Sequence, residues 1–261
     1  FLFFADLISG STEIGIKKIL SIVTGSADKD SGWYNAFYLF RLPRVITALI
    51  AGAALSVSGL LMQTLFRNPL AGPYILGISS GASLGVALTV LGAGLAISSN
   101  IAGGGLSNIL IVGSGAIGAA LIMFLVSLIS LRQKDIMTLL ILGVLIGAVV
   151  SAIVGLLQYL SQAGDLKIYV LWTMGSLRAV SMKELQILAP VIIFGLVLSI
   201  LITKHLNLML LGEENARAMG SPIKLIRIII FIAVSLMAGS ITAFCGPIGF
   251  IGIAVPHIIR T

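Results

Sequence analysis

Charged side chains are scarce in this sequence: Asp, Glu, Lys and Arg make up 10% of the 261 residues, whereas hydrophobic residues make up 58%. A soluble domain carries roughly 25% charged residues, because water must wet its surface. A surface this poor in charge requires lipid as its solvent. Inside lipid each backbone N–H and C=O must pair within its own segment. We therefore expect an all-α polytopic membrane protein.

Groups that perform covalent chemistry are also few. The single cysteine, Cys245, excludes an internal disulfide. The only histidines, His205 and His257, lie far apart and form no HExxH or similar spacing. The sequence has no GxxxxGK[ST] phosphate loop, so the chain does not hydrolyse ATP by itself. We expect no catalytic residue, no metal site and no cofactor here. A membrane-embedded enzyme would instead need an activity that mutation of these three residues abolishes.

Acidic residues are missing from the expected membrane interior. Except for Asp6, all of them fall in loops or at the ends of apolar runs. Transporters coupled to protons or sodium usually need carboxylates within the membrane. The pattern argues against an ion-coupled secondary transporter or channel, which remains the alternative and predicts transport without an ATPase. The net charge of +7 is expected to reflect topology and lipid headgroups, not nucleic acid.

Long uncharged runs occur along the whole chain, and about 20 apolar residues cross a bilayer as a helix. The runs are Val45–Phe66, Leu70–Leu95, Ile109–Leu131, Ile136–Leu160, Leu185–Ile202 and Ile228–Phe244. Phe1–Ile8 is expected to end an earlier span and Ile248–Ile259 to open a later one. We expect a single membrane domain over residues 1–261, incomplete at both ends.

Small residues indicate close helix packing, since residues four apart share one helix face. They recur at this spacing at Ala48, Gly52 and Ser56, at Gly81 and Gly85, and at Gly143, Gly147, Ser151 and Gly155. Two segments, Gly59–Ile78 and Gly239–Ala254, also resemble each other, because each breaks a helix at a proline and resumes as a Gly-containing apolar run. The helix count places the two breaks on opposite membrane faces, as inverted repeats require.

Each of three polar clusters allows either a purely structural or a functional interpretation. Arg41-Leu42-Pro43-Arg44 is either an ordinary helix start, with Pro in the first turn, or a pair of arginines that recognises carboxylates on a partner. The segment Arg67–Pro73 is either a tight turn or a constriction at a pore mouth, where Asn68 lies beside the apolar Leu70. Between two spans, a short helix is either a solvated connector or a lever for a cytosolic partner; it comprises Gly212, Glu213, Glu214, Asn215, Ala216, Arg217, Ala218, Met219 and Gly220.

These clusters together resemble the FecCD-type permease family of ABC importers. The resemblance is carried, in order, by RLPRVITALIAGAALSVSGLLMQTLFRNPLAGPYILGISSGA, LGEENARAMG and GPIGFIGIAVPHIIR. It implies a ten-span type II importer permease fold, of which this chain would hold about eight spans. The implied protein lies in the bacterial cytoplasmic (inner) membrane and translocates an iron-siderophore, haem or cobalamin-type metal chelate.

The resemblance also implies partners and residue roles. The permease would pair with a second copy of itself, with two cytosolic ATPase subunits that bind ATP and Mg, and with a periplasmic or lipoprotein substrate-binding protein. Arg41 and Arg44 match arginines that dock the binding protein, on the outer side. Asn68 and Leu70 match a cytoplasmic gate. The segment Gly212–Gly220 matches the coupling helix that contacts the ATPase. Basic residues number seven against eight on the two sides, so charge alone leaves the orientation undecided.

Overall fold

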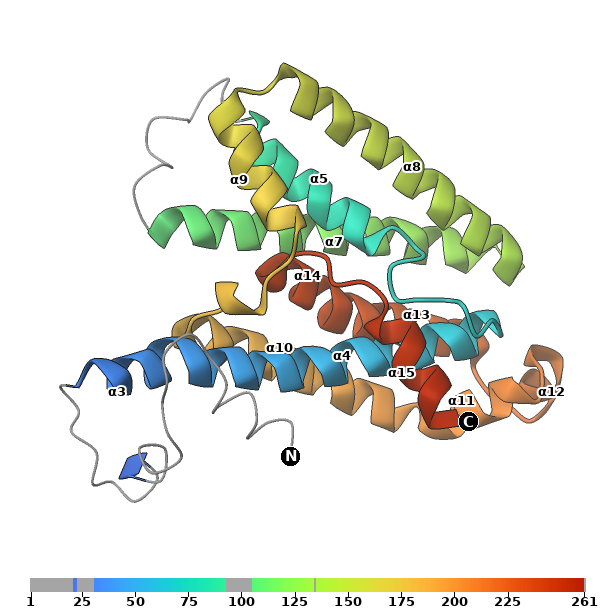
Figure 1. Ribbon diagram of the computed structural model, residues 1–261. Helices are drawn as coiled ribbons and strands as arrows, with labels where there is room; N and C mark the ends of the chain where they lie inside the picture. Colours follow the sequence, from blue (N-terminus) through green and yellow to red (C-terminus); the bar gives the residue numbers. More distant parts are fainter. Residues whose placement is uncertain (1–20, 23–30, 93–104, 134, 261) are drawn as a thin grey trace.

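The computed structural model describes residues 21–22, 31–92, 105–133 and 135–260 (Figure 1). All regular structure in those ranges is helical, which confirms the prediction of an all-α protein. Five helical segments are long and apolar enough to cross a membrane: Gly32–Phe66, Asn108–Arg132, Ile136–Leu160, Met182–Leu201 and Ile223–Cys245. The span expected to end at Phe1–Ile8 lies outside the described residues.

These five segments coincide with five of the six long apolar runs. The first contains α3 (Gly32–Ala36), the π-helical η1 (Phe37–Arg41) and α4 (Leu42–Phe66); the next three are α7 (Gly105–Arg132), α8 (Ile136–Leu160) and α10 (Met182–Leu201). The last contains α13 (Ile223–Val234), the π-helical η4 (Ser235–Gly239) and α14 (Ser240–Cys245). Local chemistry fixes several helix starts: Pro43 lies in the first turn of α4, and Ser181 and Glu184 form a capping box on α10.

The run Leu70–Leu95 is not one span, contrary to the expectation. Residues 67–77 are non-helical, and α5 covers only Ile78–Val90. Thirteen helical residues extend about 20 Å, which is too short for a ~30 Å hydrocarbon core. Pro69 and Pro73 cannot donate backbone hydrogen bonds, and Gly77 takes a left-handed conformation at φ 81° immediately before α5. Apolar composition alone therefore misjudged this stretch, because proline and glycine dominate its backbone.

A second short helix, α15 (Ile251–Arg260), follows the second predicted break. The two breaks begin at opposite ends of the bundle, as predicted. Arg67, just after α4, lines a cavity with Glu213, which pairs with Arg227 near the start of α13. The second break follows the far end of that span at Cys245. Figure 1 shows α5 and α15 extending from the middle of the bundle in opposite directions.

The two broken segments meet in the interior. The hydroxyl of Thr242 donates to the hydroxyl oxygen of Tyr74 at 3.3 Å. A Cβ added to Gly252 would lie 2.6 Å from Cδ of Pro73, and one added to Gly59 would lie 1.7 Å from the carbonyl oxygen of Gly252. Only glycine permits these approaches of α4, α15 and the first break.

The glycines that pack tightly are only partly those expected. Gly81 and Gly85 lie against backbone atoms of Gly118 and Ser114 on α7, so this expected pair is confirmed. Gly143 packs on Leu76, but a Cβ on Gly52 or on Gly155 would meet nothing within 4 Å. Sequence spacing identifies a helix face of small residues. Close approach of two backbones also requires that a neighbouring helix lie against that face at the same level.

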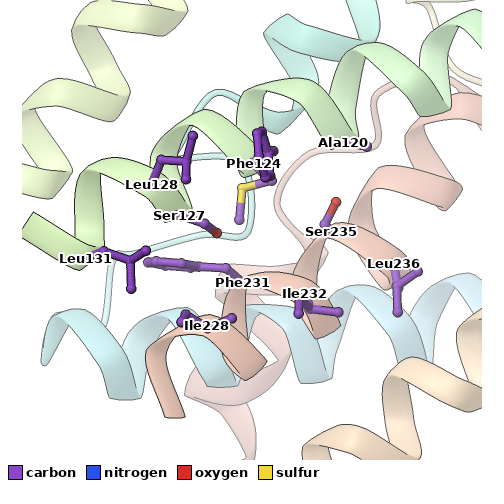
Figure 2. Close-up of a pocket in the computed structure, with 11 residues that line it drawn as sticks. Ala120, Phe124, Ser127, Leu128, Leu131, Ile228, Phe231, Ile232, Ser235 and Leu236 are labelled. Carbon is purple, nitrogen blue, oxygen red and sulfur yellow. The ribbon is translucent and has the colours of Figure 1, made fainter. Parts of the chain in front are cut away.

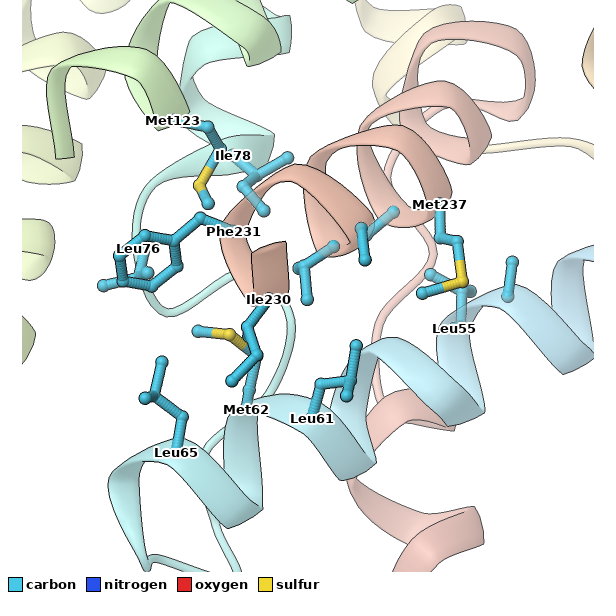
Figure 3. Packing of buried hydrophobic residues seen from close by; sticks show 14 of the residues in the cluster. Leu55, Leu61, Met62, Leu65, Leu76, Ile78, Met123, Ile230, Phe231 and Met237 are labelled. Atoms are coloured by element: carbon cyan, nitrogen blue, oxygen red, sulfur yellow. The ribbon is translucent and has the colours of Figure 1, made fainter. Parts of the chain in front are cut away.

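The hydrophobic core surrounds α4 and the last span. Leu55, Leu61, Met62 and Leu65 of α4 face Ile230, Phe231 and Met237 (Figure 3), and all seven side chains are at most 2% exposed in one cluster. In contrast, α8 lies at the periphery, and only 22% of its most apolar 18-residue stretch is buried.

Short helices complete the described part of the chain: α9 (Ala163–Thr173), η3 (Leu177–Ala179), α11 (Thr203–Leu210) and α12 (Glu213–Ala218). Neither α9 nor α11 was expected from the sequence.

Candidate functional site

The structure brings two of the three polar clusters together at one end of the bundle. Arg67 adopts a left-handed conformation (φ 47°) that ends α4, and its Nη2 donates to the carbonyl oxygen of Met209 at 3.3 Å. Met209 lies three residues before Gly212, where the short connecting helix begins. A cavity of about 390 Å³ lies here, lined by Leu65, Arg67, Asp135, Ile136 and Gly212–Asn215. The turn after α4 and the connecting helix are thus neighbours.

The expected gate residues form a tight turn at this end. The Oδ1 atom of Asn68 accepts a hydrogen bond from the backbone N–H of Leu70 at 2.9 Å, and the N–H of Ala71 donates to the Asn68 carbonyl at 3.0 Å. Both bonds fix the turn geometry. The Leu70 side chain is 72% exposed and projects from the tip. Asn68 therefore has a clear structural role in shaping the turn that presents Leu70.

The expected coupling segment is a short helix flanked by glycines. The helix α12 covers Glu213–Ala218, Gly212 has φ 118° and Gly220 has φ 81°, both conformations that favour glycine. Ala216 is fully buried against the bundle, whereas Glu214, Asn215, Arg217, Ala218, Met219 and Gly220 are exposed. One face of α12 is anchored, and its other side is a polar, accessible surface.

An ion pair that the sequence did not predict holds α12 to the last span. Nη2 of Arg227 contacts both carboxylate oxygens of Glu213, at 2.6 and 2.8 Å. Arg227 is 5% exposed, and its Nη1 donates to the carbonyl of Gln133 at 3.4 Å, in the turn between α7 and α8. A guanidinium has donors for several partners at once. From the sequence, Arg227 was expected only to be one of the basic residues on this side of the membrane. Sequence spacing gives no sign of its contacts.

Asp135 begins α8 beside this ion pair. Its carboxylate accepts from the hydroxyl of Thr138 at 2.6 Å and from the backbone N–H groups of Thr138 and Met137. These hydrogen bonds, chiefly that of the Thr138 hydroxyl, lower the pKa of Asp135, and the charge of Arg227 contributes to the same shift. Asp135 is therefore a charged N-cap that orients the first turn of α8.

The arginine cluster lies at the start of the first span. Arg41 ends the π-helical segment and is only 8% exposed, and Arg44 is half-buried in the first turn of α4. Most of the Arg41 side chain is therefore covered by its surroundings, whereas part of Arg44 is accessible. The docking role stays a prediction, and Arg44 is the more accessible of the two.

The remaining reactive side chains have structural surroundings. Nδ1 of His205 lies 3.0 Å from Oγ of Ser221, which joins α11 to the segment before α13. Cys245 is buried at the end of α14. Across the described ranges, no three His, Cys, Asp or Glu side chains cluster in a way that could hold a metal ion.

Known proteins share this architecture. A model of the FecCD transport family matches residues 1–261. The hemin transport system permease protein HmuU of Yersinia pestis is 34% identical over 254 residues, which cover 97% of this chain and 75% of that protein. The vitamin B12 import system permease protein BtuC of Salmonella typhi is 36% identical over 265 residues, covering 97% and 77%. BtuC of Klebsiella pneumoniae is 38% identical over 225 residues, covering 84% of this chain and 63% of that protein.

A solved structure agrees with the sequence relatives. It is described as an inward-facing conformation of a transporter assigned to the metal-chelate type of ABC transporters, and it covers 99% of this chain and 75% of that chain. The TM-score is 0.81 at 26% sequence identity. The fold, with its apolar spans and its anchored connecting helix, is that of a multi-pass membrane permease. The chain belongs to the FecCD transport family.

Proposed function

We propose that this chain is the membrane-spanning subunit of an ATP-driven importer in the bacterial cytoplasmic (inner) membrane. Its cargo would be a metal chelate of the iron-siderophore, haem or cobalamin type. The observation that carries the proposal is α12, a short helix with an accessible polar face that is fastened to the last span by the Glu213–Arg227 pair.

In this proposal the exposed residues of Gly212–Gly220 contact a cytosolic ATPase subunit, one for each of two permease copies. ATP and Mg bind in the ATPase and not in this chain. Closure of the ATPase pair moves α12, and Arg227 transmits the movement to α13 and to the turn before α8, since it contacts both. The hydrogen bond from Arg67 to Met209 links the same region to the turn bearing Asn68 and Leu70. This turn serves as the cytoplasmic gate.

The translocation path lies between two copies of the permease. The apolar residues Ile141, Leu145 and Val149 of α8 are 57%, 55% and 62% exposed, so this helix has surface left for a second copy and for a path lined without charge. A path of this kind suits a bulky chelate that passes without tight binding. At the opposite end, Arg41 and Arg44 receive acidic residues of a periplasmic or lipoprotein binding protein.

Substrate transfer in proteoliposomes tests this proposal. The full-length permease, its ATPase and its binding protein would be reconstituted, and uptake of haem, cobalamin and ferric siderophores compared with and without the binding protein. We expect uptake of one chelate class that requires the binding protein. Uptake that is equal without the binding protein would contradict the docking role, and uptake of none of the chelates would contradict the substrate class.

A further inference from the structure

An apolar groove lies between α7 and the last span, apart from the coupling site (Figure 2). Its volume is about 380 Å³, and its walls include Phe124 and Leu128 of α7 and Phe231 and Ile232 of α13. Phe124 is 62% exposed, so the groove opens to the surroundings of the bundle. Both walls are candidate membrane spans, which places the opening within the bilayer.

A basic cavity adjoins the groove at the end where α13 begins. Leu131 lines both spaces, and the second has a volume of about 480 Å³. Lys224 and Arg217, both exposed, line the second cavity together with Arg227, whose charge Glu213 balances. The two adjoining spaces are therefore apolar along the spans and positively charged at the end where α13 begins.

Serine residues line both spaces. Ser130 lines the basic cavity and is 6% exposed. Ser127 and Ser235 line the groove above, and Figure 2 shows both hydroxyls directed into it. Ser235 opens the π-helical η4, and such segments occur frequently at functional sites.

The length of the site matches one membrane leaflet. From Lys224 to Leu236 the chain rises about 18 Å at 1.5 Å per residue, whereas half of the ~30 Å hydrocarbon core is about 15 Å. A ligand with its charge at Lys224 would therefore extend its apolar part to about the middle of the bilayer. A water-soluble anion would fill only the basic cavity and leave the groove empty.

We propose that this site binds one anionic phospholipid. Its phosphate lies at Lys224, and one acyl chain lies along Phe124, Leu128 and Phe231. Basic pockets between spans on the cytoplasmic side are suited to anionic headgroups. The assignment of leaflet rests on the orientation given under Proposed function, whereas the binding itself does not require transport.

Tryptophan fluorescence of the full-length permease in lipid vesicles tests the site. The two tryptophans within residues 1–261, Trp33 and Trp172, line neither cavity, so a Phe124→Trp variant adds a reporter in the groove. Phosphatidylglycerol or phosphatidylcholine with brominated acyl chains would be titrated into unlabelled phosphatidylcholine. We expect quenching by brominated phosphatidylglycerol to saturate at a low mole fraction, and quenching by brominated phosphatidylcholine to rise in proportion to its content.

A second substitution tests the charge. Added to Phe124→Trp, Lys224→Gln should reduce the preference for phosphatidylglycerol about fivefold, the effect of one basic residue near an anionic surface. Lys204→Gln, an exposed lysine on α11 that lines neither cavity, should leave it unchanged. Equal quenching by both lipids would show bulk lipid only, and no quenching would show that another protein segment or a second copy covers the groove; either result overturns the proposal. Because no ATPase or substrate is present, neither outcome bears on the transport tests.

Discussion

Glu213 of α12 and Arg227 of α13 form a close ion pair, with the shorter contact at 2.6 Å. The arginine side chain is 6% exposed and that of the glutamate 24%. The pair joins a surface helix to the interior of the bundle, so a force applied to α12 reaches α13 through a charged contact shielded from water. Such a contact persists at salt concentrations that screen surface pairs.

Removal of the Glu213 charge should destabilise the permease. Glu213→Gln leaves the buried Arg227 without its counter-charge, and we expect a loss of about 2 kcal/mol in unfolding free energy, the scale of a hydrogen bond to a charged group. Glu214→Gln is the matched control, because Glu214 is exposed and forms no ion pair within the described residues. It should change stability by less than about 0.5 kcal/mol. Thermal unfolding of the purified full-length protein measures both, and equal values would refute a structural role for the pair.

Glycine at position 59 should be indispensable, whereas glycine at position 52 should not. Gly59→Ala places a methyl group within 1.7 Å of the Gly252 carbonyl oxygen, so α4 and α15 must separate. We expect a cost of about 1–3 kcal/mol and loss of a monodisperse protein in size-exclusion chromatography. Gly52→Ala lies on the same helix with nothing within 4 Å, and its better helix propensity should leave stability equal or up to about 1 kcal/mol higher. Comparable behaviour of the two variants would contradict the packing of α15 on α4.

The turn at Leu70 should be accessible to reagents and sensitive to nucleotide. Residues 1–261 contain one cysteine, Cys245, which is buried, so a Leu70→Cys variant adds an accessible thiol that reports on the turn. We expect a maleimide to label it readily without nucleotide, because Leu70 is 72% exposed, and more slowly after ATP binding to the assembled ATPase. Leu76→Cys, at a fully buried position in the same segment, should stay unlabelled. A labelling rate at position 70 that ignores nucleotide would argue against a gate there.

Charge reversal at Arg44 should weaken docking of the binding protein. In Arg44→Glu the half-buried guanidinium is replaced by a carboxylate that repels the expected acidic partner residues, and we expect at least a tenfold higher Kd by surface plasmon resonance. Lys204→Glu, near the other end of the molecule, controls for net charge. Arg41→Glu should also lower the melting temperature, since this residue is 8% exposed. An unchanged Kd for Arg44→Glu would remove this residue from the docking surface.

The sequence predicted helices where hydrophobicity decided the structure and was less accurate where the backbone decided it. The bounds of α8 are those of its uncharged run, Ile136–Leu160. The run from Leu70 was misjudged because its prolines and glycines outweigh its apolar composition. The glycine-flanked helix at Glu213 was predicted because glycine punctuates it on both sides.

Long-range contacts lie beyond what sequence patterns reveal. Nothing near Arg227 in the chain indicates that its partner is Glu213. Its contact with the carbonyl of Gln133 is equally hidden, since 94 residues separate Arg227 from Gln133. The burial of Arg41 is equally invisible to a motif, because it depends on how η1 packs. The motifs identified the right segments, and tertiary packing determines how each side chain is used.

The energy source of uptake tests the account most directly. Proteoliposomes containing the full-length permease, its ATPase and its loaded binding protein would receive ATP in one experiment and a proton or sodium gradient without ATP in another. We predict that substrate accumulates only with ATP, and that hydrolysis continues while uptake falls when Glu213 is replaced by Gln. Accumulation driven by the ion gradient in the absence of ATP would contradict the account and establish an ion-coupled transporter.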